Sequence, residues 1–288
     1  MKTYQTCIPC IIRLFTSTLE KTDLPEEGKK EFLTRFEGYW KNADMSVPPA
    51  RTVGVIYNQV LEETGLTDLF KEQKEKAVQE SLRLYPRLKS IVNRAEDKLD
   101  TALRISALGN ILDSGNPNSY DLEEEIHRLF ASPLRGESMD LFQEKLGSSS
   151  ELLFLADNAG ETVFDRVLIE TIDIPVRYAV KAGPALDDAL LEDARQAGLA
   201  DLADLIETGT SYPGTYLPSC SDSFQSIFQE APLIIAKGQA NYETLSEVER
   251  DLFFLLTVKC EVIGEDIGLP VGSLALKYHP NLRGHLEG

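Results

Sequence analysis

Acidic and amide side chains follow two short apolar segments in the second half of the chain. The first segment ends in Asp157 and Asn158, and the second leads to Asp187 and Asp188. Carboxylate and amide oxygens suit Mg²⁺ or Mn²⁺ better than Zn²⁺, which prefers nitrogen and sulfur ligands. If the segments are parallel strands, their carboxyl ends meet at the edge of the sheet where ligands bind. These residues predict a site for a hard divalent cation.

Lysines follow the next two apolar segments. Lys237 ends the third segment, and Lys259 comes after the fourth. An ammonium group beside a metal would neutralise the part of a phosphate charge that the metal does not balance. The four segment ends together favour a phosphate ester as the ligand.

Six motifs give the chain a resemblance to a known family. In chain order they are Cys7-x-x-Cys10, Gly109-Asn110-x-x-Asp113-x-Gly115, Asp157-Asn158-Ala-Gly-Glu161, Gly183-Pro-x-x-Asp187-Asp188-Ala, Lys237-Gly-Gln-x-Asn241-Tyr-Glu243 and Lys259-Cys260. Each motif alone has low specificity, but the ordered set spans about 250 residues. The set resembles the damage-control phosphatase family, in particular its archaeal and bacterial branch with the Cys-x-x-Cys motif.

The resemblance implies a metal-dependent phosphoric monoester hydrolase. Its metal ligands would be Asp157, Asn158 and Asp188, and the metal would be one Mg²⁺ or Mn²⁺ ion, with Co²⁺ or Ni²⁺ as alternatives. We choose Asp188 over Asp187 because the branch often has Asn-Asp-Ala where this chain has Asp-Asp-Ala. The substrate would be a small phosphorylated metabolite, either a sugar phosphate or a damaged phosphorylated cofactor.

The resemblance also brings in residues from the first half of the chain. Asn110 and Asp113 are implied to reach the site from the helical part, and Lys237 is implied to bind phosphate. We assign catalytic roles to Asp157, Asn110 and Asp113. The predicted substrate-binding residues are Lys237, Asn110, Glu161, Asn241 and Lys259.

Each of these residue types also has a structural alternative. Asp157 and Asn158 are favoured helix N-caps. Asp188 could be a solvated loop acid and Lys237 an exposed lysine. Glu161 could be a first-turn acid that interacts favourably with a helix dipole.

Three cysteines could form a separate site. Cys7 and Cys10 open a predicted helix, where the dipole lowers a thiol pKa. They could bind a second metal or cycle through a disulfide, with Cys260 as a third member. Two cysteines of one motif cannot complete a tetrahedral zinc site, which needs two further ligands. The alternative is that Cys7 and Cys10 are buried and pack as small hydrophobic residues.

Composition and charge limit the partners. Of the 288 residues 42% are hydrophobic and 26% charged, so a sizeable core can form. The net charge of −18 disfavours nucleic acids and anionic membranes, but it allows a small anion in a cleft beside a metal. We find no secretory signal and no apolar run of about 18 residues, so we expect a cytoplasmic protein.

The hydrophobic pattern changes near residue 148. Residues 1–148 show helical spacing and predict an all-helical subdomain. Residues 149–288 contain the four apolar segments with helical stretches between the first three, which predicts an α/β Rossmann-like core of three layers, α/β/α, with a mostly parallel sheet. The predicted helices cover Cys7–Lys21, Glu26–Lys41, Ala50–Thr64, Asp68–Tyr85, Ser90–Leu112, Leu122–Phe130, Glu161–Thr171 and Leu190–Ala197. The predicted strands cover Leu152–Ala156, Val176–Val180, Leu233–Ala236 and Phe253–Val258.

Other functions remain open at this point. No histidine lies in a motif, which disfavours a Ser-His-Asp hydrolase, and the glycine-rich dinucleotide and P-loop patterns are absent. A methyltransferase that uses S-adenosylmethionine on carboxyl groups is one alternative, because a Rossmann-like core permits it. A non-catalytic metabolite-binding module is the other.

Overall fold

One mixed sheet forms the centre of the molecule. The computed structural model describes residues 1–40, 43–112, 134 and 138–281. The strands are β1 (Leu152–Leu155), β2 (Val176–Val180), β3 (Asp204–Glu207), β4 (Ile234–Lys237), β5 (Leu252–Thr257) and β6 (Leu274–His279). Their order is β3-β2-β1-β4-β5-β6; the first five run parallel, and β6 pairs antiparallel with β5. The predicted α/β fold class is confirmed.

The central strands are apolar on both faces. Phe154 of β1 pairs with Tyr178 of β2 and Ile235 of β4, and all three are fully buried. Parallel strands need crossover connections that carry helices onto both faces, so their side chains are covered on both sides. This explains why β1, β4 and β5 read as continuous apolar runs in the sequence.

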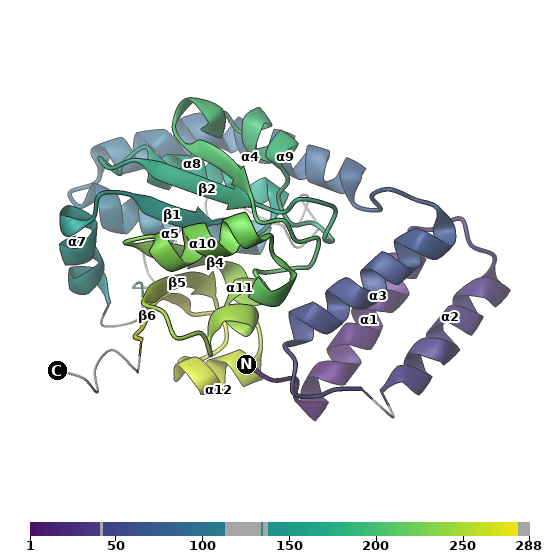
Figure 1. Cartoon of the computed structure of the whole chain (residues 1–288). Coiled ribbons are helices and arrows are strands. Elements are labelled where there is room, and N and C mark those ends of the chain that lie inside the picture. Colours follow the sequence, from purple (N-terminus) through teal and green to yellow (C-terminus); the bar gives the residue numbers. More distant parts are fainter. Residues whose placement is uncertain (41–42, 113–133, 135–137, 282–288) are drawn as a thin grey trace.

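Helices cover the two faces of the sheet. The first face carries α4 (Lys71–Arg94), α5 (Lys98–Leu112) and α8 (Thr162–Ile169), and the second carries α10 (Asp222–Glu230), α11 (Gly238–Leu245) and α12 (Glu261–Ile267). Smaller elements complete the body: α7 (Met139–Ser148), α9 (Leu191–Gln196), η2 (Ala159–Glu161), η3 (Leu199–Asp201) and η4 (Leu217–Ser219). Figure 1 shows the layers.

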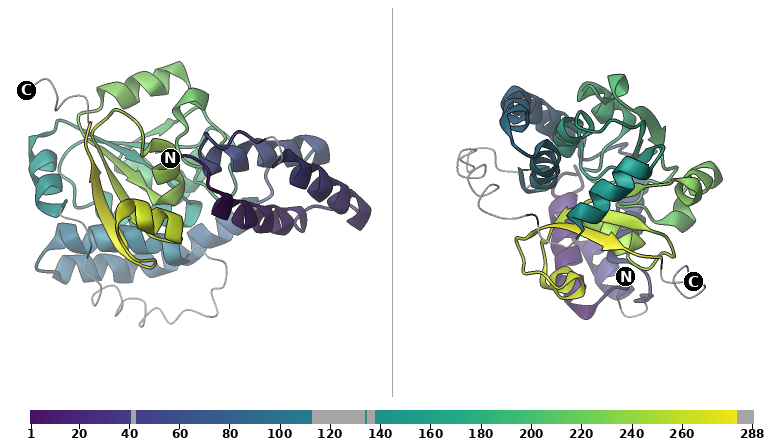
Figure 2. Two further views of the ribbon diagram at one scale, coloured as in Figure 1. Left: turned by 90° about the horizontal axis from the view of Figure 1, so that it is seen from below. Right: turned by 90° about the vertical axis from the view of Figure 1, so that its left-hand side faces the viewer.

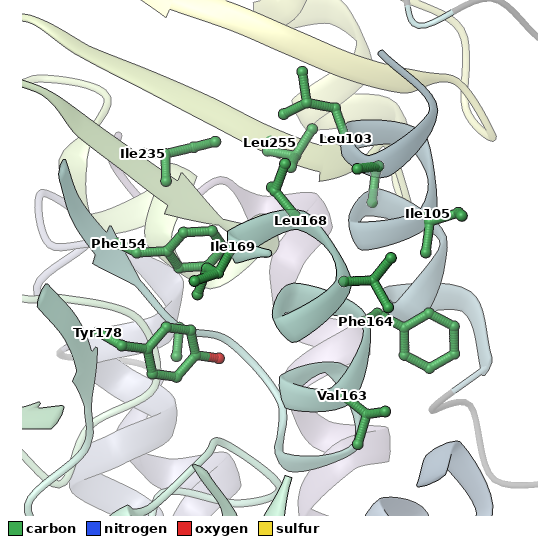
Figure 3. Packing of buried hydrophobic residues seen from close by; sticks show 14 of the residues in the cluster. Leu103, Ile105, Phe154, Val163, Phe164, Leu168, Ile169, Tyr178, Ile235 and Leu255 are labelled. Carbon is green, nitrogen blue, oxygen red and sulfur yellow. The ribbon is translucent and has the colours of Figure 1, made fainter. Parts of the chain in front are cut away.

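The first face is tightly packed around α8. Leu168 of α8 lies near Leu103 of α5 and Leu255 of β5, and the Phe164 ring lies on the side of α8 that faces α5 (Figure 3). Gly109 allows the close approach of α5, because a Cβ atom there would lie 3.0 Å from the Phe164 ring. Burial of each such large apolar side chain contributes about 1.5–3 kcal/mol to folding. This packing fixes α8 and α5 relative to the ends of the strands.

A helical lobe projects from the α/β body. It consists of α1 (Ile8–Leu19), α2 (Glu26–Tyr39) and α3 (Pro49–Thr64), preceded by η1 (Gln5–Cys7). Figures 1 and 2 show these helices side by side, away from the sheet. They bury their own apolar cluster, which includes Phe15, Phe36 and Tyr57 and also takes in Leu186 from the α/β body.

The structure differs from the sequence predictions in a few places. Helix α4 continues through Pro86, where we had expected a break, because the residues beyond it, Leu88 and Val92, pack into the core. Strands β3 and β6 were not predicted. The predicted helix Leu122–Phe130 lies outside the described residues.

The predicted division at residue 148 stays a prediction. The apolar clusters do not follow that position: α4 and α5 share one core with the sheet, whereas α1–α3 share another. None of the helices in the described ranges combines the length and apolar character needed to cross a membrane.

Candidate active site

The site lies where the strand order reverses. Strand β1 has β2 on one side and β4 on the other, and crevices at such a point bind ligands in open α/β sheets. Asp157 follows β1, and Lys237 ends β4. Gly238 has φ +75, and a Cβ atom there would lie 1.8 Å from Asp157 Oδ2, so only glycine lets the backbone pass this carboxylate.

Backbone hydrogen bonds bring the Asp187-Asp188 segment against the end of β1. Asn158 and Asp188 form an isolated antiparallel bridge. Ala159 N donates to Asp187 O, and Ala189 N donates to Asp157 O, both at 2.8 Å. The three predicted metal ligands therefore lie together, on two segments locked to each other.

The Asp188 carboxylate is buried and held on two sides. Lys181 Nζ lies 3.1 Å from Asp188 Oδ2, and Gly214 N donates to the same oxygen at 3.3 Å. Burial raises the pKa of Asp188 to about 6. The charge of Lys181 offsets this increase only in part, and the charge of Asp187 adds to it. The ionised form of Asp188 is thus disfavoured mainly by burial, despite its pairing with Lys181.

Asp157 experiences a similar environment. Burial raises its pKa well above the ordinary value, and the carboxylates of Glu161 and Asp188 raise it further against the opposing charges of Lys259 and Lys181. A positive charge placed nearby would favour the ionised form of a carboxylate whose pKa is raised in this way.

The helical lobe supports the loops that carry Asp188. Leu186 has φ +57, a strained conformation for a side chain with a Cβ atom, and its side chain is buried in the apolar cluster of the lobe. The Tyr212 ring packs against Gly54 of α3, and Asn58 Nδ2 donates to Ser211 Oγ at 3.2 Å. These contacts place the lobe against the loop that contains Gly214.

Lys237 lies in the interior of the protein rather than on the surface. Its side chain is fully buried, and Nζ donates to Glu161 Oε2 at 2.9 Å and to Asp165 Oδ1 at 2.6 Å. Burial alone would lower the pKa of Lys237, but the two carboxylates outweigh it and raise the pKa. The predicted contact with phosphate stays a prediction.

Asn241 and Lys259 occupy different positions. Asn241 is buried in α11; its Nδ2 donates to Ala156 O and Lys237 O, and its Oδ1 accepts from Thr215 Oγ1. Lys259 is exposed after β5, and its charge lowers the pKa of both Asp157 and Asp187, against the larger effect of burial. Lys259 is therefore a solvent-accessible cation beside the predicted metal ligands.

Two predicted catalytic residues cannot be placed. Asp113 lies outside the described residues, and for Asn110 the structure describes only the backbone, which is part of α5. Their predicted roles stay predictions.

The donor set fits a hard divalent cation. Among the described residues, no three His, Cys, Asp or Glu side chains are grouped so that they alone could hold a metal. The predicted set instead has two carboxylates and one carboxamide, and Mg²⁺ typically takes one or two protein carboxylates and completes its shell with water and substrate phosphate. In the part of the chain that the structure describes, five carboxylates and three lysines act on one another here, which is an excess of two negative charges when all are ionised. These charges belong to Asp157, Glu161, Asp165, Asp187 and Asp188, and to Lys181, Lys237 and Lys259. Lys74, which also acts on Asp187, is paired with Asp68 and adds no net charge.

Comparison with known proteins identifies the family. A family model described as the damage-control phosphatase ARMT1-like domain matches residues 3–275. The chain belongs to this damage-control phosphatase family. The sequence resemblance is thereby confirmed, while the branch marked by Cys7 and Cys10 stays a prediction.

Three proteins similar to this chain come from archaea. The damage-control phosphatase PH1575 of Pyrococcus horikoshii is 32% identical, over 95% of this chain and 97% of that protein. A damage-control phosphatase of Archaeoglobus fulgidus is 34% identical over 77% of this chain and 80% of its own length, and the uncharacterized protein MJ0202 of Methanocaldococcus jannaschii is 32% identical over 94% and 93%. The crystal structure of PH1575, described as a DUF89 family protein, superimposes with a TM-score of 0.86 at 30% identity and covers 97% of this chain and 99% of that one.

Three cysteines of this family member, Cys7, Cys10 and Cys260, are close enough to act on one another electrostatically. Cys7 ends η1, Cys10 is exposed in α1, and Cys260 is the N-cap residue of α12. The helix dipole was expected to lower the pKa of the Cys7 thiol. Instead, burial raises this pKa, and Glu243 and the thiols of Cys10 and Cys260 raise it further. The redox or second-metal role stays a prediction.

Sequence reasoning missed several side chains that surround the predicted ligands. Asp165 and Tyr178 are buried behind Lys237, and Lys181 is paired with Asp188. The signal for Asp165 was available: it is the one acid within the apolar helical stretch Thr162–Ile169, four residues after Glu161.

Proposed function

We propose that this chain is a divalent-metal-dependent phosphatase that hydrolyses small phosphorylated metabolites, either sugar phosphates or damaged phosphorylated cofactors. Family membership supports the phosphatase activity. The observation that carries the metal dependence is the joining of Asp157, Asn158 and Asp188, with both carboxylates buried and each acted on by a further carboxylate, Glu161 or Asp187.

The metal would be held by the two carboxylates and the carboxamide oxygen. A bound Mg²⁺ or Mn²⁺ supplies a Lewis acid for a phosphoryl oxygen and balances the buried negative charge. Two contacts support this proposal for Asp188, those with Lys181 and Gly214 N, and the Gly238 backbone passes close to Asp157.

Among the described residues, Lys259 is the cation best placed to meet the substrate. It is exposed, follows a strand end, and acts electrostatically on Asp157 and Asp187. Its ammonium group would bind the phosphate from the solvent side and orient it toward the metal ligands. Lys237 is closed to solvent, so a contact between it and phosphate would require the pairs with Glu161 and Asp165 to open.

A phosphatase screen tests the proposal. Purified protein is stripped of metal and assayed on a panel of sugar phosphates, phosphorylated cofactors and a generic phosphate ester, with Mg²⁺, Mn²⁺, Co²⁺ or Ni²⁺. We expect turnover that requires an added metal and disappears in Asp157→Asn. Equal turnover with a chelator present, or no turnover with any combination, would contradict the proposal.

A further inference from the structure

Asp165 is a fully buried acid in α8 that the proposed chemistry does not use. Its Oδ1 accepts hydrogen bonds from Ser106 Oγ and Lys237 Nζ, both at 2.6 Å, and its Oδ2 accepts one from Tyr178 OH at 2.8 Å. Burial of a carboxylate is costly unless it is paired and hydrogen-bonded. Three donors, from α5, β2 and β4, satisfy Asp165 and hold it in one position.

The contacts of Asp165 lead to a predicted metal ligand. Lys237 bridges Asp165 and Glu161 Oε2, and Glu161 Oε1 accepts from Asn158 Nδ2 at 3.0 Å. An ionised glutamate only accepts, so the Asn158 carboxamide must present its NH₂ group to Glu161. Because the carboxamide is planar, its oxygen then faces away from Glu161 and remains available as a ligand.

A purely stabilising role explains this arrangement less well. A buried ion pair is often no more stabilising than apolar residues of the same volume. Here the charged groups form a continuous series that ends at Asn158, and side chains behind a metal ligand characteristically set its orientation.

We propose that Asp165 is a positioning residue of the metal site. It fixes Lys237, which fixes Glu161, which turns the carboxamide oxygen of Asn158 toward the metal. The inference rests on the proposed function, because it requires Asn158 to be a ligand.

Metal binding by two variants tests the inference. Asp165→Asn keeps the shape of the side chain but removes its charge, and Tyr178→Phe removes one hydrogen bond without changing any charge. Mn²⁺ alone is titrated into metal-free protein by calorimetry. We expect the Kd for Mn²⁺ to rise about 10- to 100-fold in Asp165→Asn and roughly three- to tenfold in Tyr178→Phe.

A matched control separates positioning from general destabilisation. Asp193 is also buried, and its Oδ2 accepts from Leu190 N at 2.9 Å at the start of α9. Asp193→Asn should lower the melting temperature but leave the Kd for Mn²⁺ within about twofold of wild type. Activity gives a second readout: saturating Mn²⁺ should restore most of the kcat of Asp165→Asn, because the defect lies in holding the metal.

The outcomes are distinguishable. An unchanged Kd in Asp165→Asn overturns the inference while leaving the proposed function intact. A change in Asp165→Asn with none in Tyr178→Phe shows that only charge matters and also overturns positioning. If Asp165→Asn does not fold, Tyr178→Phe decides alone. If wild-type protein binds no Mn²⁺, the proposed function fails and the inference fails with it.

Discussion

Replacement of Gly238 by alanine should displace Asp157, the proposed metal ligand, without disturbing the rest of the fold. Gly238 has φ +75, and a Cβ atom at this position would lie 1.8 Å from Asp157 Oδ2. Real Cβ contacts are essentially never closer than 3.0 Å, so the carboxylate must move by roughly 1.2 Å or more. Metal–ligand distances tolerate deviations of only about 0.2 Å.

The cost of Gly238→Ala therefore has two parts. The left-handed backbone costs about 1–2 kcal/mol of folding stability for a residue with a Cβ atom. Displacement of Asp157 removes the proposed ligand, so we expect Mn²⁺ binding at least about 100-fold weaker. This effect should be larger than that of losing a residue that only hydrogen-bonds to a ligand. Phosphatase activity should fall in parallel.

Gly268 provides the control for backbone strain. It has φ +80, yet a Cβ atom there would have no heavy atom within 4 Å. Gly268→Ala should lose similar stability and retain wild-type affinity for Mn²⁺. The assays are thermal denaturation and calorimetric titration of metal-free protein. If Gly238→Ala binds Mn²⁺ as tightly as Gly268→Ala, the proposal that Asp157 is a metal ligand is wrong.

Two further pairs of variants test the roles assigned to neighbouring residues. Asp188→Ala should abolish activity on any accepted phosphate ester while Asp187→Ala retains a measurable fraction, and the reverse order would show that Asp187 is the ligand. Lys259→Ala should lower kcat/KM by on the order of 100-fold with little change in melting temperature. Lys237→Ala should instead cost about 3–5 kcal/mol of folding stability, because it leaves Glu161 and Asp165 buried without their cation. A Lys237→Ala protein that melts like wild type would contradict this account of its burial.

The sequence predicted the central strands because they are buried on both faces. Strands β1, β2, β4 and β5 were recognised from their apolar runs. Strand β3, Asp204–Glu207, was missed because it is an edge strand with an exposed acid at each end and gives no apolar run. Strand β6 was missed because it is an antiparallel edge strand whose second half is polar and only partly covered.

The candidate site was predictable where it depends on strand ends. Asp157 and Lys237 follow neighbouring parallel strands, so their proximity follows from topology alone. The burial of Lys237 was not predictable, because a lysine after a strand looks the same in sequence whether it faces solvent or a carboxylate. Asp165 gave a signal in the sequence as the one acid of an apolar helical stretch, but its partners Ser106, Tyr178 and Lys237 became known only from the packing of α8.

The location of a bound metal tests the central claim most directly. Crystals of the protein grown or soaked with Mn²⁺ would give an anomalous difference peak at the manganese absorption edge. We expect one peak with oxygen ligands from Asp157, Asn158 and Asp188, and no peak at that position in an Asp188→Ala crystal. A peak elsewhere, for instance at Cys7 and Cys10, or no peak at saturating Mn²⁺, would contradict the account.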